Sequence, residues 1–280
     1  MLVRQASAKA DPTSPKLRRA SNFVKNTNSL LPSDVKSTIG QPFMELTVVE
    51  STNIYAMERL QANLAGHGAA FFAHHQTAGK GQRGKTWSDE PNTNIAMSVI
   101  VDCSFLSIAQ PFPLSVMVAV ACHDLFNKYA TDETFIKWPN DIYWRDRKAG
   151  GILIETQVRG GQWLGAVVGI GININQTAFP EILKNPVSLR QITGKEYDTV
   201  AVAKELCECL ERRYVQLRNG EFENLLGYYN SLLFKRGEKV RLKSNSAAFY
   251  CKIDCVSIEG ELVVIDGPKE SFRFGEVEWI

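Results

Sequence analysis

The stretch from Phe135 to Thr156, FIKWPNDIYWRDRKAGGILIET, holds residue types that contradict one another in an ordinary buried sheet. Phe135 and Ile136 predict the end of a buried strand, but the next residue is a lysine. Pro139 fixes its own φ angle and has no backbone N–H to donate, so it ends the strand pairing. Lys137 therefore stands at the edge of the strand, where a buried sheet can become the wall of a pocket.

The second half of the stretch predicts another strand, with an accessible backbone. A charged hairpin tip, Arg145 to Lys148, precedes Gly150 and Gly151. The two glycines let another group approach the backbone closely. Each piece alone has an ordinary explanation, since a lysine after a strand is usually solvated and a charged tip is usually only an exposed turn. The combination of a cation, a fixed turn, an acid and two glycines indicates a ligand site.

This combination resembles the hallmark of biotin protein ligases, in which K-W-P-N-D is followed by K-x-x-G-I-L-x-E. Further segments resemble that family's motifs and occur in its order: the pocket entrance Glu50-Ser51-Thr52-Asn53, the glycine loop HQTAGKGQRGKTW from His75 to Trp87, the strand VGIGININ from Val168 to Asn175, and Gly275-Glu276-Val277 near the C-terminus. The likeness runs from about Glu45 to the C-terminus.

The resemblance implies an α+β fold. A mixed β-sheet packed on helices is expected over residues 41–234, as a catalytic domain of the class II synthetase-like biotin/lipoate ligase type. A small C-terminal domain, an SH3-like β-barrel, is expected over residues 235–280, where the sequence itself predicts only short strands. Residues 1–40 are polar and lack apolar periodicity, so we expect a disordered basic tail.

Apolar periodicity independently predicts the elements of the larger domain. Strands are expected over residues 45–49, 69–75, 95–101 and 162–174, and helices over residues 53–64, 113–126, 199–217 and 222–233.

The resemblance also implies a two-step reaction. In the first step the biotin carboxylate attacks the α-phosphorus of ATP, which carries Mg²⁺, to give biotinyl-5′-AMP and pyrophosphate. In the second step the ε-amine of a lysine on a biotin carboxyl carrier domain, of acetyl-CoA carboxylase or another biotin-dependent carboxylase, displaces AMP.

Specific roles follow from the matched motifs. Lys137 is expected to bridge the two anions of the first step, with Arg83 as a second catalytic group, and Asp141 is expected to receive the acceptor lysine. The residues expected around biotin are Ser51, Thr52, Asn53, Gln76, Gly79, Lys80, Gly81, Lys137 and Gly151. Those expected around ATP are Lys80, Arg83, Lys85, Trp87, Asn140, Lys148 and Asn173.

The chain departs from the family pattern at two points. Where the family often has G-R-G-R-R-G, this chain has a neutral Gln82 in place of one arginine. The hypothesis is that biotinyl-5′-AMP leaves faster than from an arginine-bearing relative. An adenine-stacking tryptophan is also missing near Asn185-Pro186-Val187, so the side chain that covers the base is not identified.

Two other enzyme classes remain as alternatives. The segment Gly79 to Thr86 satisfies the Walker A pattern of P-loop NTPases, but a P-loop requires a helix to begin at Lys85 or Thr86. The residues after Trp87 instead predict turns and then a strand. A lipoate ligase of similar fold is disfavoured by the glycine loop and by the all-β C-terminal segment.

Composition excludes several further classes. Seven basic and two acidic residues give residues 1–40 a charge of +5, which leaves about −3 on the rest of the 280-residue chain, so no DNA partner is expected. The six cysteines show no zinc-ligand spacing, so no metal site is expected and the thiols are interpreted as reduced. No apolar run is long enough for a membrane helix. We expect a cytoplasmic enzyme, with a homodimer as an open alternative.

Overall fold

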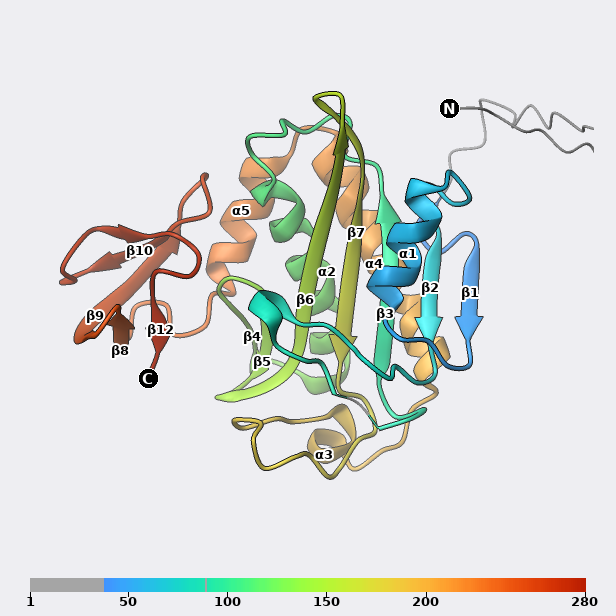
Figure 1. Ribbon diagram of the computed structural model, residues 1–280. Helices are drawn as coiled ribbons and strands as arrows, with labels where there is room; N and C mark the ends of the chain where they lie inside the picture. Colours follow the sequence, from blue (N-terminus) through green and yellow to red (C-terminus); the bar gives the residue numbers. More distant parts are fainter. Residues whose placement is uncertain (1–37, 89) are drawn as a thin grey trace, which may run out of the picture. The chain divides into compact units, whose positions relative to one another are not determined.

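Seven strands form one mixed sheet in the computed structural model of the chain, which describes residues 38–280 except residue 89 (Figure 1). The sheet order is β1-β2-β3-β7-β6-β5-β4, where β1 runs parallel to β2 and every other neighbouring pair is antiparallel. The strands are β1 Phe43–Leu46, β2 Ala70–Ala73, β3 Ile95–Val101, β4 Thr134–Lys137, β5 Asp141–Trp144, β6 Arg147–Arg159 and β7 Gln162–Ile172.

The two faces of this sheet carry different helices, because successive side chains of a strand point to opposite faces. Helix α1, Thr52–Gln61, packs on the face that bears Phe71, Ile100 and Val167. The opposite face packs against the larger core with the remaining helices, which are α2 Phe112–Ala130, α3 Leu189–Thr193, α4 Thr199–Arg218 and α5 Phe222–Ser231. The face covered by α1 is therefore the less completely covered one (Figure 1).

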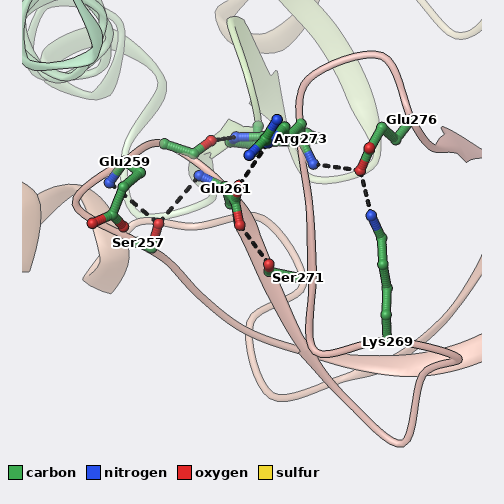
Figure 2. Close-up of polar contacts among 9 residues, drawn as sticks. Ser257, Glu259, Glu261, Lys269, Ser271, Arg273 and Glu276 are labelled. Carbon is green, nitrogen blue, oxygen red and sulfur yellow. Dashed lines mark hydrogen bonds and ion pairs between the residues drawn. The ribbon is translucent and has the colours of Figure 1, made fainter. Parts of the chain in front are cut away.

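A second sheet follows α5 and is antiparallel, in the order β11-β10-β9-β8-β12. Its strands are β8 Lys239–Ser244, β9 Ala247–Val256, β10 Leu262–Ile265, β11 Ser271–Phe272 and β12 Glu278–Trp279. Figure 2 shows Glu261 between Ser271 and Arg273, and Glu276 beside Lys269, so side-chain bonds reinforce the short β11. Among the described residues no pairing joins β11 to β12; the sheet is open, and the expected SH3-like barrel is not confirmed.

Most of the long elements lie where the periodicity predicts them, including β3 at Ile95–Val101 and α4 at Thr199–Arg218. Two local interpretations were wrong. Arg147 and Lys148 begin β6 instead of belonging to the hairpin tip. Ile39, which the sequence assigns to the tail, is buried in the larger core and donates its N–H to Glu211.

The remainder of the predicted tail, residues 1–37, lies outside the described residues. Residues 38–280 belong to one compact unit, without a division at residue 235. Among the described residues, no helix has both the length and the hydropathy that crossing a membrane requires.

Candidate active site

A row of directly paired residues crosses four strands on the α1 face of the large sheet. Lys137 pairs with Asp141, Asp141 with Gly151, and Gly151 with Gly171. Directly opposite residues place their side chains on the same face of a sheet. The middle of this row is therefore bare backbone, with the charged side chains of β4 and β5 at one end.

A parallel row joins Leu153, Gly169 and Ser98 on the same face. A Cβ atom on Gly169 would lie 2.1 Å from Oδ1 of Asn53, and one on Gly171 would lie 2.4 Å from the ring of Trp87. Both side chains consequently rest directly on the backbone of β7, and neither glycine can be replaced without moving them. The glycines form the floor of the site.

At the α1 end of the floor, neutral polar groups form a connected cluster. The backbone N–H of Thr52 donates to Oε1 of Gln76 at 2.8 Å, and Ser98 donates to the hydroxyl oxygen of Thr52 at 2.7 Å. Asn53 donates to Glu155 at 2.8 Å, and Ser51 is buried beside it at the start of α1. Four of the residues predicted to surround biotin are thus brought together.

Ser98 belongs to this cluster but was missed from the sequence. The available signal was its hydroxyl in the otherwise apolar strand Ile95–Val101, where a buried polar group needs a hydrogen-bond partner.

The glycine loop from Ala78 to Trp87 folds as a small hairpin over β6 and β7; it is the teal segment in front of those strands in Figure 1. Gly81 donates its N–H to the Lys85 carbonyl at 2.7 Å, and Trp87 donates to the Gly79 carbonyl at 2.9 Å. A cavity of about 500 Å³ lies between this loop and β6. Lys80, Arg83 and Lys85 are among the residues that line this cavity.

The geometry of the loop excludes a P-loop. Its tip is the single 3₁₀ turn η1, Gln82–Gly84, and Lys85 has extended dihedral angles of φ −71° and ψ 151°. No helix begins there, so the backbone amides do not converge on a phosphate as a P-loop requires.

Trp87 closes the loop against the floor. Its ring lies on Gly171, and its indole N–H is buried without a hydrogen-bond partner among the described residues. A buried unsatisfied donor costs about 1–3 kcal/mol. The predicted contact of Trp87 with ATP stays a prediction, whereas its packing role is evident.

Lys148 lies above Gly151, at the β5 end of the floor. Its Nζ is 2.6 Å from Oδ1 of Asp141, and a Cβ on Gly151 would be 3.4 Å from the same Nζ. A register shift between Ile142 and Tyr143 pairs Lys148 with Tyr143, and this β-bulge turns the lysine to the face that carries Gly151. The side chain keeps 36% of its surface exposed, so its charge remains accessible.

Two asparagines predicted to contact ATP have their side-chain amides occupied by backbone carbonyls. Asn140 donates to the Ile152 carbonyl at 2.8 Å, and Asn173 donates to the Val187 carbonyl at 3.1 Å. Their evident contribution is to fix the turn before β5 and the segment beside β6. Direct contact of either side chain with ATP stays a prediction.

Lys137 lies in a cage of aromatic rings instead of over the glycine floor. Its Nζ is 4.5 Å from the centroid of Tyr143, 5.5 Å from that of Phe234 and 4.8 Å from that of Trp279. It also donates to the Tyr143 hydroxyl at 3.2 Å. Burial lowers the pKa of Lys137 to about 8. Its expected role as the bridge between two substrate anions is not tested, and Lys148 is the lysine nearer to the floor.

Arg83 reaches from the loop to the C-terminal sheet. Its Nη1 donates to the Gly275 carbonyl at 3.4 Å, and its guanidinium lies 5.9 Å from the centroid of Phe274. Arg83 also has a φ of 56°, a left-handed conformation that costs energy for a residue with a Cβ.

Comparison with known proteins agrees with this arrangement. The model of the biotin/lipoate A/B protein ligase family matches residues 45–173. The bifunctional ligase/repressor BirA of Bacillus spizizenii is 30% identical over 255 residues, which cover 88% of this chain and 78% of that protein. This chain belongs to the biotin protein ligase family.

Other members of the biotin protein ligase family resemble it over similar lengths. The biotin--[acetyl-CoA-carboxylase] ligase of Mycobacterium tuberculosis is 30% identical over 210 residues, covering 73% of this chain and 76% of that one. The structure of the Aquifex aeolicus biotin protein ligase in complex with biotin and ATP has a TM-score of 0.70 and 24% identity, covering 84% of this chain and 97% of that one. The latter likeness supports the fold.

Proposed function

We propose that this chain activates biotin with ATP to biotinyl-5′-AMP and transfers the biotin to a lysine of a biotin carboxyl carrier domain. The observation that carries the proposal is the glycine floor of Gly151, Gly169 and Gly171, which lies between a neutral polar cluster and the Lys148–Asp141 pair. A long ligand with a neutral head and an anionic tail fits such a floor, and biotin has that form.

The neutral cluster would hold the ureido ring. That ring presents both a carbonyl acceptor and N–H donors, and an apolar pocket needs a few placed polar groups to orient it. Ser51, Thr52, Asn53 and Gln76 lie together at the α1 end of the floor. Backbone groups of Gly79, Lys80 and Gly81 would complete the enclosure.

Lys148 is the group best situated to bring the reacting anions together. Two negative charges about 4 Å apart repel each other by about 4 kcal/mol at an effective dielectric constant of 20. A carboxylate oxygen of biotin forms the new bond to the α-phosphorus, and the bond to pyrophosphate breaks. Lys148, with its ammonium above Gly151, would offset the charge of both partners, while Lys80, Arg83 and Lys85 would face the oxygens of the triphosphate.

Asp141 has the position required for the second step. The acceptor amine must lose its proton before its nitrogen attacks the acyl carbon and AMP departs. The carboxylate of Asp141 borders Gly151 and holds Lys148, so it can receive the incoming ammonium group.

Biotin-dependent exchange of labelled pyrophosphate into ATP tests the first step. The expected result is exchange that requires biotin and, in a separate reaction with labelled biotin, transfer of the biotin label to a purified carrier domain. Lipoate in place of biotin is the matched control. Exchange supported by lipoate alone, or ATP hydrolysis indifferent to biotin, would refute the proposal.

We further propose, from the family resemblance alone, a cytoplasmic location and an SH3-like character for the C-terminal sheet. The same transfer assay, run with different carrier domains, identifies the acceptor. Sedimentation tests whether the chain forms a homodimer.

A further inference from the structure

The carboxylate of Glu155 lies at one end of a chain of side-chain hydrogen bonds that begins in the neutral polar cluster. Glu155 accepts a hydrogen bond from Nδ2 of Asn53 at 2.8 Å. The amide oxygen of Asn53 lies 2.5 Å from the hydroxyl of Ser98, and that hydroxyl lies 2.7 Å from the hydroxyl of Thr52. The chain therefore links a charged group on β6 to a hydroxyl beside the proposed place of the biotin ring.

The amide of Asn53 has one orientation in this chain. Asn53 is only 4% exposed and rests on Gly169, where a Cβ atom would lie 2.1 Å from Oδ1, so the amide has no room to swing aside. A half turn would exchange its oxygen and nitrogen, but an ionised carboxylate only accepts hydrogen bonds. The nitrogen must consequently face Glu155 and the Leu153 carbonyl, which lies 3.4 Å from it, and the oxygen must face Ser98.

The fixed amide decides which hydroxyl donates to which. Either hydroxyl can donate across the 2.7 Å contact of Thr52 and Ser98, but Ser98 has a single proton. An amide oxygen cannot donate, so the Ser98 proton lies in the 2.5 Å contact with Asn53, and Thr52 donates to Ser98. Oε1 of Gln76 already accepts the Thr52 backbone N–H at 2.8 Å and does not depend on that hydroxyl. Thr52 then offers only lone pairs to a ligand.

Resting on the proposed ligase function, we infer that Glu155 is a positioning residue: through Asn53 and Ser98 it fixes the Thr52 hydroxyl as an acceptor for a ring N–H of biotin. Gln76 complements it, because its Oε1 is held by Thr52 and its Nε2, beside Gly79, can donate to the ring carbonyl. A cyclic urea presents an N–H next to a carbonyl, and it matches an acceptor next to a donor. Glu155 sets this polarity without touching the ligand.

Glu155→Gln in the full chain tests the inference, with biotin-dependent pyrophosphate exchange as the assay. A glutamine amide can donate to Asn53, which permits the reversed chain and turns the Thr52 proton away from Ser98. The KM for biotin is expected to rise about tenfold, the factor of one hydrogen bond, while kcat and the KM for ATP stay unchanged. Ser98→Ala breaks the chain and is expected to give the same rise. The double variant is expected to be no worse than either single one, because both act through the same bonds.

Three comparisons separate positioning from general damage. Glu261→Gln is the matched control, since Glu261 also holds a serine hydroxyl, that of Ser271, beside β10 (Figure 2), and its KM for biotin is expected to stay unchanged. Glu155→Asp keeps a group that only accepts and is expected to bind biotin better than Glu155→Gln does. Desthiobiotin keeps the cyclic urea but lacks the sulfur-bearing ring, and its calorimetric affinity is expected to fall in Glu155→Gln by the same factor as that of biotin.

An unchanged KM for biotin in Glu155→Gln would overturn the inference, and so would additive losses in the double variant. A fall in kcat together with equal rises in both KM values would assign Glu155 to general stability and overturn it too. Should Ser98→Ala fail to fold, Ser98→Cys takes its place, because a thiol is only a weak donor. Absence of biotin-dependent exchange in the unmodified chain would instead reject the proposed function.

Discussion

The surroundings of Lys148 and Lys137 differ although both lysines belong to the same motif stretch. Lys148 keeps 36% of its side chain exposed and is ion-paired with Asp141 above a glycine floor. The ammonium of Lys137 instead lies beside the rings of Tyr143, Phe234 and Trp279, and burial lowers its pKa to about 8. The first environment keeps a charge available to an incoming anion at any pH near neutrality. The second makes the charge depend on pH. Two lysines of one motif stretch can therefore have different roles in the site.

The largest expected effect comes from removing the accessible charge. Lys148→Met is expected to lower biotin-dependent pyrophosphate exchange by about 10²- to 10³-fold, because a placed electrostatic stabiliser of a reacting anion commonly contributes that factor. Lys137→Met, with the same change of side chain, measures whether the lysine beside the aromatic rings also serves the reacting anions. A larger loss of exchange in Lys137→Met than in Lys148→Met would reverse the comparison between the two lysines.

The next largest effect is expected from a substitution in the glycine floor. In Gly171→Ala the new methyl group would lie 2.4 Å from the Trp87 ring, so the ring and the end of the glycine loop must move. Overpacking of this kind destabilises the fold by about 1–3 kcal/mol, which thermal unfolding would show, and displacement of the loop is expected to weaken the affinity for ATP by calorimetry. Gly227→Ala in α5, where a Cβ meets nothing within 4 Å, is the matched control and is expected to bind normally.

A smaller effect is expected from adding a positive charge at Gln82, over the glycine floor. Gln82 donates weakly to the Ile152 carbonyl at 3.4 Å, at the tip of the loop over the floor. Gln82→Arg is expected to slow the release of biotinyl-5′-AMP severalfold, since a new charge near the adenylate adds about 1 kcal/mol of attraction at a partly exposed site. Stopped-flow release of the purified intermediate measures this rate, and equal rates in both chains would contradict it.

The smallest effect is expected from changing the pH, which titrates Lys137. Burial lowers the pKa of the Lys137 ammonium, Asp141 raises it, and the charges of Lys148, Lys184 and Lys235 lower it further. The net pKa of about 8 means that Lys137 is charged below pH 8 and loses its proton above it. The rate of biotin-dependent pyrophosphate exchange is therefore expected to fall a few-fold between about pH 7 and pH 9, as the charge of Lys137 disappears.

The matched variant for this pH profile is Lys137→Arg. Its guanidinium stays protonated throughout the range, so its exchange rate is expected to stay constant over the same pH range. A fall of equal size in both chains would assign the titration to another group.

The sequence predicted the long elements, and the structure brings together four of the residues that it indicated for biotin. The periodicity of residues 95–101 and 199–217 is unambiguous, and Ser51, Thr52, Asn53 and Gln76 sit in motifs whose order matches the family. These features depend on residues that lie close together in the sequence, so they can be recognised in a single sequence.

The surroundings of the two lysines could not be predicted in the same way. Lys148 and Gly151 are three residues apart, and in a regular strand they would point to opposite faces. Only the bulge opposite Tyr143 brings them to one face, and that bulge depends on register. The rings around Lys137 come from residues 143, 234 and 279, which no spacing rule connects.

The seating of Trp87 on Gly171 has a consequence for how ligands enter. The loop is tied at its start by the backbone bonds of Thr77 to Val49 and of Ala78 to Glu50, and at its end by an indole resting on bare β7 backbone. Because both of its ends are held, the loop cannot rotate outward as a rigid body about one end. The tip, Gln82–Gly84, is held by two long side-chain bonds, from Gln82 to the Ile152 carbonyl and from Arg83 to the Gly275 carbonyl. When these two bonds break, the tip can lift and open the cavity beside β6.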